Sequence, residues 1–158
     1  MKEITTTLAF LLRPGEIMLA MKKRGHGEGN WNGVGGKIEP GETIEQAMVR
    51  ECQEETGVTP TAYTKVARHV FHEQYKGEPC KNTVHVYLCT AWTGQLTESE
   101  EMAPAWFSLD AIPYDRMWPD DIHWMPDMLA NKLLETCFYY DDNNVLQSYD
   151  ITEVTEFS

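Results

Sequence analysis

The stretch Gly36–Val58 constrains the fold of this chain more than any other. It reads GKIEPGETIEQAMVRECQEETGV, which joins a turn signal to a full set of helix boundary signals. Pro40-Gly41 predicts a turn. Thr43 and Gln46 have the spacing of a capping box, in which each side chain bonds the backbone N–H of the other residue, and Gly57 predicts a left-handed helix end. The stretch therefore predicts a loop followed by one helix over 44–56.

Three carboxylates of this helix fall on one face. Glu51, Glu54 and Glu55 are three and four residues apart, so they crowd together, and like charges at these spacings destabilise a helix. One interpretation is a solvated acidic face. The other is a site for a divalent cation, because Mg²⁺ takes oxygen ligands and completes its shell with water and substrate phosphates.

The same stretch resembles the signature of the Nudix hydrolase family, G-x5-E-x7-R-E-U-x-E-E-x-G-U, in which U is aliphatic. The matching positions are Gly36, Glu42, Arg50, Glu51, Glu54, Glu55, Gly57 and Val58. Cys52 stands where the family carries an aliphatic residue, and it is apolar enough to pack there. The resemblance implies an α/β fold, the Nudix α/β/α sandwich with a mixed sheet. It also implies hydrolysis of a nucleoside diphosphate linked to another moiety, with Mg²⁺ or Mn²⁺ as cofactor.

Size and composition exclude several other classes of protein. With 158 residues, 42% of them hydrophobic, we expect residues 1–158 to form a single ordered domain. The four cysteines lack the spacing of a zinc site or a disulfide framework. A net charge of −12 argues against a nucleic-acid polymer or an anionic membrane as partner. Leu8–Leu12 is too short an apolar run to span a bilayer or direct secretion. We therefore expect a cytoplasmic monomer whose partner is a small-molecule nucleotide.

Hydrophobic periodicity predicts the remaining elements. Strands are expected over 5–12, 17–21, 62–71, 83–92 and 105–109, with a polar loop around 76–79 and a closing hairpin formed by 138–140 and 145–151. A second helix is expected over 121–135, with Trp124, Met128 and Leu129 on one side. Strands before and after a helix, with another helix late in the chain, suggest a mixed sheet between helices.

Four further segments resemble the MutT branch of the family, whose mammalian members hydrolyse oxidised purine nucleoside triphosphates. They are MKKRG at 21–25, WNG at 31–33, WF at 106–107 and MWPDD at 117–121. The likeness extends over most of the chain, and it is weaker in the segment 71–83 and in the closing hairpin.

The residues of these segments suit a purine pocket in their own right. Asn32 offers one acceptor and two donors to a base edge, and Trp118 offers a flat face for stacking. Asp120 and Asp121 are adjacent acids, so in a partly apolar pocket one of their pKa values should rise. The resemblance implies that exchange of protonation between the two aspartates lets the pocket accept a guanine-like or an adenine-like face. The alternative is structural: Asp120 caps the second helix and Trp118 is a core residue.

The resemblance also implies the roles of individual residues. The implied substrate-binding residues are Thr7, Lys22, Asn32, Val34, Gly35, Gly36, Lys37, Phe71, Trp118, Pro119, Asp120 and Asp121. The implied metal ligands are the carbonyl of Gly35 and the carboxylates of Glu51, Glu54, Glu55 and Glu101. Catalysis is assigned to Glu54, Glu55, Glu101 and Arg50, with Arg50 orienting the carboxylates by ion pairing. The general base stays open between Glu54 and Glu101, and Glu98 and Glu100 are alternatives to Glu101.

Two departures from the mammalian members bear on base preference. His26 stands where they carry Phe, and a histidine can also hydrogen-bond and titrate. The segment 71–83 is expected to be a longer loop than theirs. His69 and His72 are three apart on a predicted strand, so they should face opposite sides and cannot share a metal ion.

The function that these features predict is Mg²⁺-dependent hydrolysis of oxidised purine nucleoside triphosphates, such as 8-oxo-dGTP and 2-hydroxy-dATP, to the monophosphate and pyrophosphate. Such an enzyme sanitises the nucleotide pool and so avoids DNA damage. One alternative is a Nudix hydrolase of a methylated purine triphosphate or a dinucleoside polyphosphate. The other is a nucleotide-binding regulator without activity, although all the signature glutamates are present.

Overall fold

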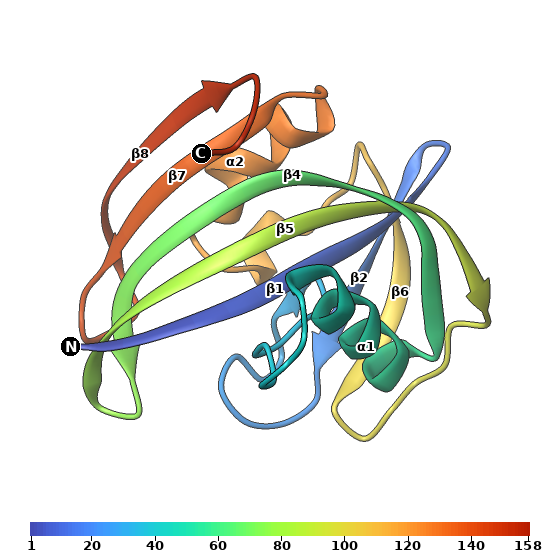
Figure 1. Ribbon diagram of the computed structural model, residues 1–158, viewed down its shortest axis with the longest axis horizontal. Helices are drawn as coiled ribbons and strands as arrows, with labels where there is room; N and C mark the ends of the chain where they lie inside the picture. Colours follow the sequence, from blue (N-terminus) through green and yellow to red (C-terminus); the bar gives the residue numbers. More distant parts are fainter.

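One mixed sheet of eight strands forms the frame of the molecule (Figure 1), and the computed structural model describes all 158 residues. The strands are β1 (Lys2–Arg13), β2 (Glu16–Lys22), β3 (Trp31–Asn32), β4 (Val58–Tyr75), β5 (Glu78–Gly94), β6 (Met102–Ser108), β7 (Leu133–Tyr140) and β8 (Leu146–Val154). Their order is β3-β2-β1-β5-β4-β7-β8, with β6 paired to β2. The pairs β1–β5 and β4–β7 are parallel and the others are antiparallel.

The two α-helices cover opposite faces of this sheet. Successive strand residues point to opposite sides, so Phe10, Ile17 and Leu19 pack with helix α2 (Asp121–Leu129) in one core cluster. Their neighbours along β1 and β2, among them Leu11 and Met18, pack with helix α1 (Ile44–Thr56) in the other. A short 3₁₀ turn, η1 (Tyr114–Arg116), precedes α2. The expected α/β/α sandwich with a mixed sheet is therefore confirmed. Neither helix is long and apolar enough to cross a membrane.

Helix α1 has the boundaries that its local signals predict. The Thr43 side chain accepts a hydrogen bond from the Gln46 N–H, and the Gln46 side chain accepts one from the Thr43 N–H. Gly57 ends the helix with a φ of 81°, in the left-handed region that glycine adopts without steric cost. Met48 and Cys52 are fully buried, so the carboxylates occupy the face of the helix that the core does not use.

The second helix is shorter than predicted. It ends at Leu129 rather than at residue 135, and residues 133–140 form strand β7. Pro126 lies inside α2 and cannot donate a helical hydrogen bond, while Asn131 takes a positive φ of 67° that ends the helix. Leu134, Thr136 and Phe138 are buried at every second position, which is the periodicity of a strand.

The connection expected around 76–79 is present but shorter than predicted. β4 continues to Tyr75 and β5 begins at Glu78, so the connection is only Lys76-Gly77. Both turn residues have positive φ, 51° and 78°, as in the type I′ turn that matches the twist of a hairpin. The extra length of this segment is thus added to a β-ribbon, whose alternate side chains face the concave side of the sheet.

Three of the four cysteines, Cys52, Cys80 and Cys89, are buried, and Cys137 is partly exposed. The neighbouring Cys89 and burial raise the pKa of Cys52, so its reactive thiolate is suppressed. We expect a thiol reagent to label Cys137 alone in the native protein, and Cys52→Val to cost less than about 1.5 kcal/mol of stability, as near-isosteric core changes do. Mass mapping of the labelled peptides checks this, and fast labelling of Cys52 would contradict it.

Candidate active site

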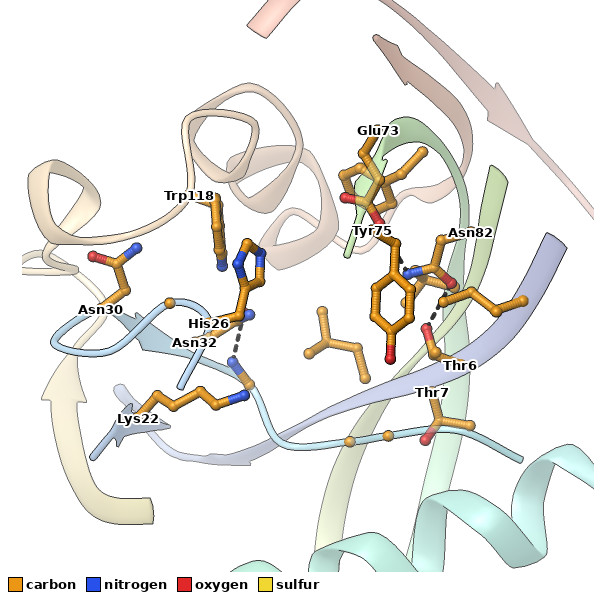
Figure 2. Close-up of a pocket in the computed structure, with 18 of the residues that line it drawn as sticks. Thr6, Thr7, Lys22, His26, Asn30, Asn32, Glu73, Tyr75, Asn82 and Trp118 are labelled. Carbon is orange, nitrogen blue, oxygen red and sulfur yellow. Dashed lines mark hydrogen bonds between the residues drawn. The ribbon is translucent and has the colours of Figure 1, made fainter. Parts of the chain in front are cut away.

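A cavity of about 410 Å³ lies on the concave side of the sheet, within the size range of small-molecule sites. The strands that form its wall contribute mainly alternate residues, as the pleat requires. These are Ile4, Thr6 and Leu8 from β1, Phe71, Glu73 and Tyr75 from β4, and Asn82 and Val84 from β5. The lining also includes His26, Asn32, Gly35, Gly36, Trp118 and Asp120. Trp118 and His26 stand on one side of the cavity, and Glu73, Tyr75 and Asn82 stand on the other (Figure 2).

The glycine-rich segment lets helix α1 approach the first strand closely. A Cβ on Gly35 would lie 1.8 Å from the carbonyl oxygen of Thr7, and one on Gly36 would lie 2.6 Å from Oε1 of Glu51. Only glycine therefore fits at position 35, and a side chain at position 36 would displace the Glu51 carboxylate. Val34, which is predicted to bind substrate, does not lie at the cavity. It is buried in the core next to α1, because its backbone pairs with Ala9 and directs its side chain away.

Two glutamates of α1 reach this glycine segment. Oε2 of Glu55 accepts a hydrogen bond from the Gly35 N–H at 3.3 Å. Burial, followed by the charge of Glu51, raises the pKa of Glu55 to about 8. Burial also raises the pKa of Glu51, against the opposing effect of Arg50. The close approach of α1 thus brings carboxylates together in a partly buried place where their mutual repulsion is poorly screened.

Arg50 ties the acidic residues of the helix and its preceding loop together. Its guanidinium donates to Glu42 at 2.7 and 3.0 Å, to Glu51 at 3.0 Å and to Glu54 at 3.1 Å. It also donates to the carbonyl of Lys37 at 3.1 Å. Arg50 holds the pKa of Glu42 below its usual value. The arrangement is the ion-pair network that the sequence predicts for Arg50, and the rigid planar fork of arginine suits it.

The acidic loop before β6 contributes one carboxylate to this region. Glu98 pairs with Lys23 and Glu100 with Arg24. Glu101 lies 3.7 Å from Arg24, and its charge is among those that raise the pKa of Glu55. Of the three alternatives, Glu101 is therefore the one whose charge reaches the helix carboxylates.

The donor set fits a hard divalent cation, although no three acidic, histidine or cysteine side chains converge at ligand spacing. Arg50 holds Glu51 and Glu54, and the Gly35 N–H holds Glu55. The carbonyl of Gly35 accepts no hydrogen bond, so it is free to act as a ligand. A cation here would neutralise the like charges that raise the pKa of Glu55, and small rotations of the glutamates could bring their oxygens to it.

The other end of the cavity carries the adjacent aspartates, each only 3% exposed. Asp120 lines the cavity; it accepts a hydrogen bond from Nε1 of Trp124 at 3.0 Å and another from the Tyr140 hydroxyl. Asp121 accepts the Trp118 N–H at 3.2 Å and does not line the cavity. Burial raises the pKa of both residues, and the charge of Asp120 raises that of Asp121 further. Asp120 occupies the N-cap position of α2, but its side chain makes no capping bond, so it does not cap the helix.

The residues beside Asp120 suit a planar ligand. Trp118 lines the cavity, with the His26 ring 5.1 Å away at an angle of 31°. The Asn32 oxygen accepts the Gly33 N–H at 2.8 Å, which leaves its amide N–H groups available. Pro119 is exposed and lies outside the cavity, on a neighbouring depression near Tyr149. Pro119 therefore does not form part of the wall beside Trp118.

Further predicted residues lie between the two ends. Lys22, Lys37 and Phe71 line the cavity, and the charge of Lys22 lowers the pKa of Glu55, so its ammonium reaches the carboxylates. Thr7 also lines it, and its buried hydroxyl has no hydrogen-bond partner in the protein. A buried polar group of this kind needs a partner, which a bound ligand can supply.

Sequence reasoning missed several residues of the wall. Glu73, Tyr75, Asn82 and Tyr140 line the cavity. The signal that could have found the first two is strand alternation from Phe71, which the expectation of a loop concealed. His69 and His72 do face opposite sides, as predicted: His69 is fully buried and bonds Thr136 at 2.6 Å, while His72 stacks on Tyr139 at the other face.

The chain is similar to known proteins in both sequence and fold. The NUDIX domain model matches residues 2–128. The "Oxidized purine nucleoside triphosphate hydrolase" of Mus musculus is 42% identical over 151 residues, 96% of this chain and 96% of that protein. The protein of the same name in Danio rerio is 41% identical over 150 residues, 95% of each chain. The crystal structure of a mutator MutT protein from Bacillus halodurans matches with a TM-score of 0.81 at 24% identity, over 94% of this chain and 97% of that one, which is a likeness of fold.

Removing the Glu55 charge should stabilise the metal-free protein. The folded-state pKa of about 8 lies above the ordinary value of 4.5, so the wild type loses stability as the pH rises from about 4.5 to about 8. We expect Glu55→Gln to abolish that loss and to raise the Tm at pH 8 by a few degrees, about 2–4 °C per kcal/mol at this size. Mg²⁺ should raise the Tm of the wild type more than that of the variant.

Thermal scans between pH 5 and 8, with and without Mg²⁺, make this comparison. Glu153→Gln, at an exposed position on β8, is the control for the loss of one surface charge. If Glu55→Gln and Glu153→Gln respond alike to pH and to Mg²⁺, then Glu55 does not hold the cation.

Proposed function

This chain belongs to the Nudix hydrolase family, and from that premise we propose that it hydrolyses oxidised purine nucleoside triphosphates, such as 8-oxo-dGTP and 2-hydroxy-dATP, to the monophosphate and pyrophosphate. The observation that carries this proposal is one cavity with two chemically distinct ends. Trp118 and the buried Asp120 stand at one end, and the glycine segment that contacts Glu51 and Glu55 stands at the other.

The relatives support this choice of substrate class. Two vertebrate proteins named for the hydrolysis of oxidised purine nucleoside triphosphates match the chain along nearly its whole length. The match covers both ends of the cavity, so the proposed activity does not depend on a segment that the relatives lack.

The acidic end would hold Mg²⁺, with Mn²⁺ as a substitute, through Glu51, Glu54, Glu55, Glu101 and the carbonyl of Gly35. When bound, the cation neutralises charge on the phosphates and lowers the pKa of a coordinated water. The chain itself supplies orientation. Arg50 fixes Glu51 and Glu54, while Lys22 offers an ammonium to the phosphates from the cavity wall.

A general base must accept a proton from the attacking water. Glu54 and Glu101 are the candidates, because each side chain is 57% exposed and lies beside the buried carboxylates. Glu55 is less suited to this role since the Gly35 N–H holds one of its oxygens.

The aspartate pair would select the base by its protonation. An ionised carboxylate only accepts hydrogen bonds, and a protonated one can donate. Burial raises the pKa values of both Asp120 and Asp121, and the charge of Asp120 raises that of Asp121 further, so we expect the pair to titrate as a unit that shares one proton. Asp120 would contact the base, and Asp121 would act through Asp120 and through the Trp118 N–H.

We place this enzyme in the cytoplasm as a monomer that acts on the free nucleotide pool. A net charge of −12 disfavours a nucleic-acid polymer as substrate. The local cations Lys22 and Lys37 line the cavity and offset that charge where the phosphates would lie.

A panel of nucleotides tests the proposed activity. Pyrophosphate release should be fastest for 8-oxo-dGTP and 2-hydroxy-dATP and should require Mg²⁺ or Mn²⁺. It should stop with EDTA, and the loss of one ligand charge in Glu55→Gln should lower kcat by about 100-fold or more, because metal ligation stabilises the transition state by several kcal/mol. A preference for a methylated purine triphosphate or a dinucleoside polyphosphate would replace this substrate, and no hydrolysis of any nucleotide would overturn the enzyme assignment.

Asp120→Asn and Asp121→Asn should change base preference. Each variant fixes an amide donor and ends the proton exchange. The ratio of kcat/KM for 8-oxo-dGTP to that for 2-hydroxy-dATP should therefore change. The change should correspond to a free energy of about 1–3 kcal/mol, the size of one base-edge contact. The ratio should also lose its pH dependence in the variants, while Asp110→Asn, at an exposed site, leaves it unchanged. An unaltered ratio at every pH in both variants would show that these aspartates do not read the base.

A further inference from the structure

A polar group interrupts the wall of the cavity opposite Trp118. Glu73 on β4 and Asn82 on β5 line this wall together with Thr6 on β1, among the apolar side chains of Ile4 and Val84. Figure 2 shows Glu73, Asn82 and Thr6 gathered on one side of the cavity, facing Trp118 and His26 across it.

The β4–β5 ribbon directs Glu73 into the cavity. Glu73 is two residues beyond Phe71 on the same strand, so the two side chains share a face, and Asn82 is paired with Phe71 on β5. Burial raises the pKa of Glu73, and the charge of Asp120 raises it further. Both residues line one cavity, and the charge of Asp120 therefore reaches the carboxyl group of Glu73.

Hydrogen bonds fix the orientation of the Asn82 amide. The Thr6 hydroxyl donates to Oδ1 of Asn82 at 3.0 Å, and Nδ2 of Asn82 is 3.5 Å from Oε1 of Glu73, to which it donates. Thr6 thus turns the amide nitrogen toward Glu73. One N–H of Asn82 and the second carboxylate oxygen of Glu73 have no partner in the protein. The wall therefore presents a donor beside an acceptor.

This pair complements the edge that oxidation creates on a purine. In an unmodified purine N7 is an acceptor, and it would repel the carboxylate of Glu73. Oxidation at C8 gives the lactam form, in which N7 carries a hydrogen and C8 carries a carbonyl oxygen. A carboxylate can then accept from N7–H while an amide N–H donates to the new carbonyl, and each bond would satisfy a group that is otherwise poorly paired.

We propose that Glu73 and Asn82 recognise the N7–H and C8 carbonyl of an 8-oxopurine, and so distinguish oxidised from unmodified guanine. This inference rests on the proposed function and deepens it. Asn32 and Asp120 take the pyrimidine edge of the base on the Trp118 side, and the Glu73–Asn82 pair takes the imidazole edge from the opposite wall. A base that is oxidised only at C2, such as 2-hydroxyadenine, has an unmodified imidazole edge and gains nothing from the pair.

Glu73→Met tests the proposal, since it removes the acceptor and keeps the length of the side chain. We expect the ratio of kcat/KM for 8-oxo-dGTP to that for dGTP to fall by about tenfold or more, the loss expected for a hydrogen bond to a charged group. The kcat/KM for 2-hydroxy-dATP should not fall. Glu78→Gln, on the exposed end of the same ribbon, should leave all three values unchanged.

Glu73→Gln and Asn82→Leu test the same proposal independently. Glu73→Gln keeps the shape of the side chain and an oxygen acceptor but loses the charge, so it should lower the same ratio by a smaller factor. Asn82→Leu removes the donor to the C8 carbonyl and should also lower it. Circular dichroism and the Tm establish that each variant is folded, and Glu73→Gln is the deciding variant if Glu73→Met does not fold.

The wild-type measurement separates the two proposals. If the wild type does not prefer oxidised purines, the proposed function fails. If the wild type prefers them and the ratio of 8-oxo-dGTP to dGTP stays the same in the folded Glu73 variants, the recognition by Glu73 and Asn82 fails alone. A parallel loss for 2-hydroxy-dATP would also overturn it, because such a loss indicates a general change in the cavity.

Discussion

The repulsion among carboxylates that α1 brings against bare backbone is the constraint on which the site depends. Gly35 and Gly36 have no Cβ, so the helix lies close enough for Glu55 to bond the Gly35 N–H and for Glu51 to contact Gly36. Burial and like charge then raise the pKa of Glu55 to about 8. Such an arrangement costs stability in the folded protein. Arg50 offsets part of this cost through its ion pairs, and a divalent cation would offset the rest. The same feature that strains the metal-free protein is thus the one that suits it to bind a metal ion.

The length of the β4–β5 ribbon shapes the opposite end of the cavity. Because the ribbon continues without a loop to Lys76-Gly77, its alternate residues extend the wall beyond Phe71 to Glu73 and Tyr75. The segment before α2 closes the other side with Trp118 and Asp120. In the proposed function, a planar base between them would meet hydrogen-bonding groups on both of its edges, and the phosphates would lie near the carboxylates of α1.

The parts of the fold that local signals determine could be predicted from the sequence. Helix α1 has its predicted bounds because Thr43 and Gln46 begin it and Gly57 ends it, all within a few residues of the helix itself. The predicted second helix is longer than α2, because the prediction takes no account of Pro126 or of the alternating burial that begins at Leu134. In the site, Asn32, Trp118 and Asp120 were placed through the family resemblance. Val34 and Pro119 do not line the cavity. Glu73 and Asn82 are absent from the prediction, because strand pairing decides which of their side chains face inward.

In the proposed binding mode, the metal ion lies at the carboxylates beside the glycine segment, and the base lies at the end of the cavity next to Trp118. A crystal structure with Mn²⁺ and a non-hydrolysable 8-oxo-dGTP analogue tests it most directly, because the anomalous signal of manganese locates the ion without assumptions. We expect a manganese peak bound by Glu51, Glu55 and the carbonyl of Gly35, with the base stacked on Trp118 and bonded to Asp120. A manganese peak away from these carboxylates, or a base outside this cavity, would contradict this binding mode.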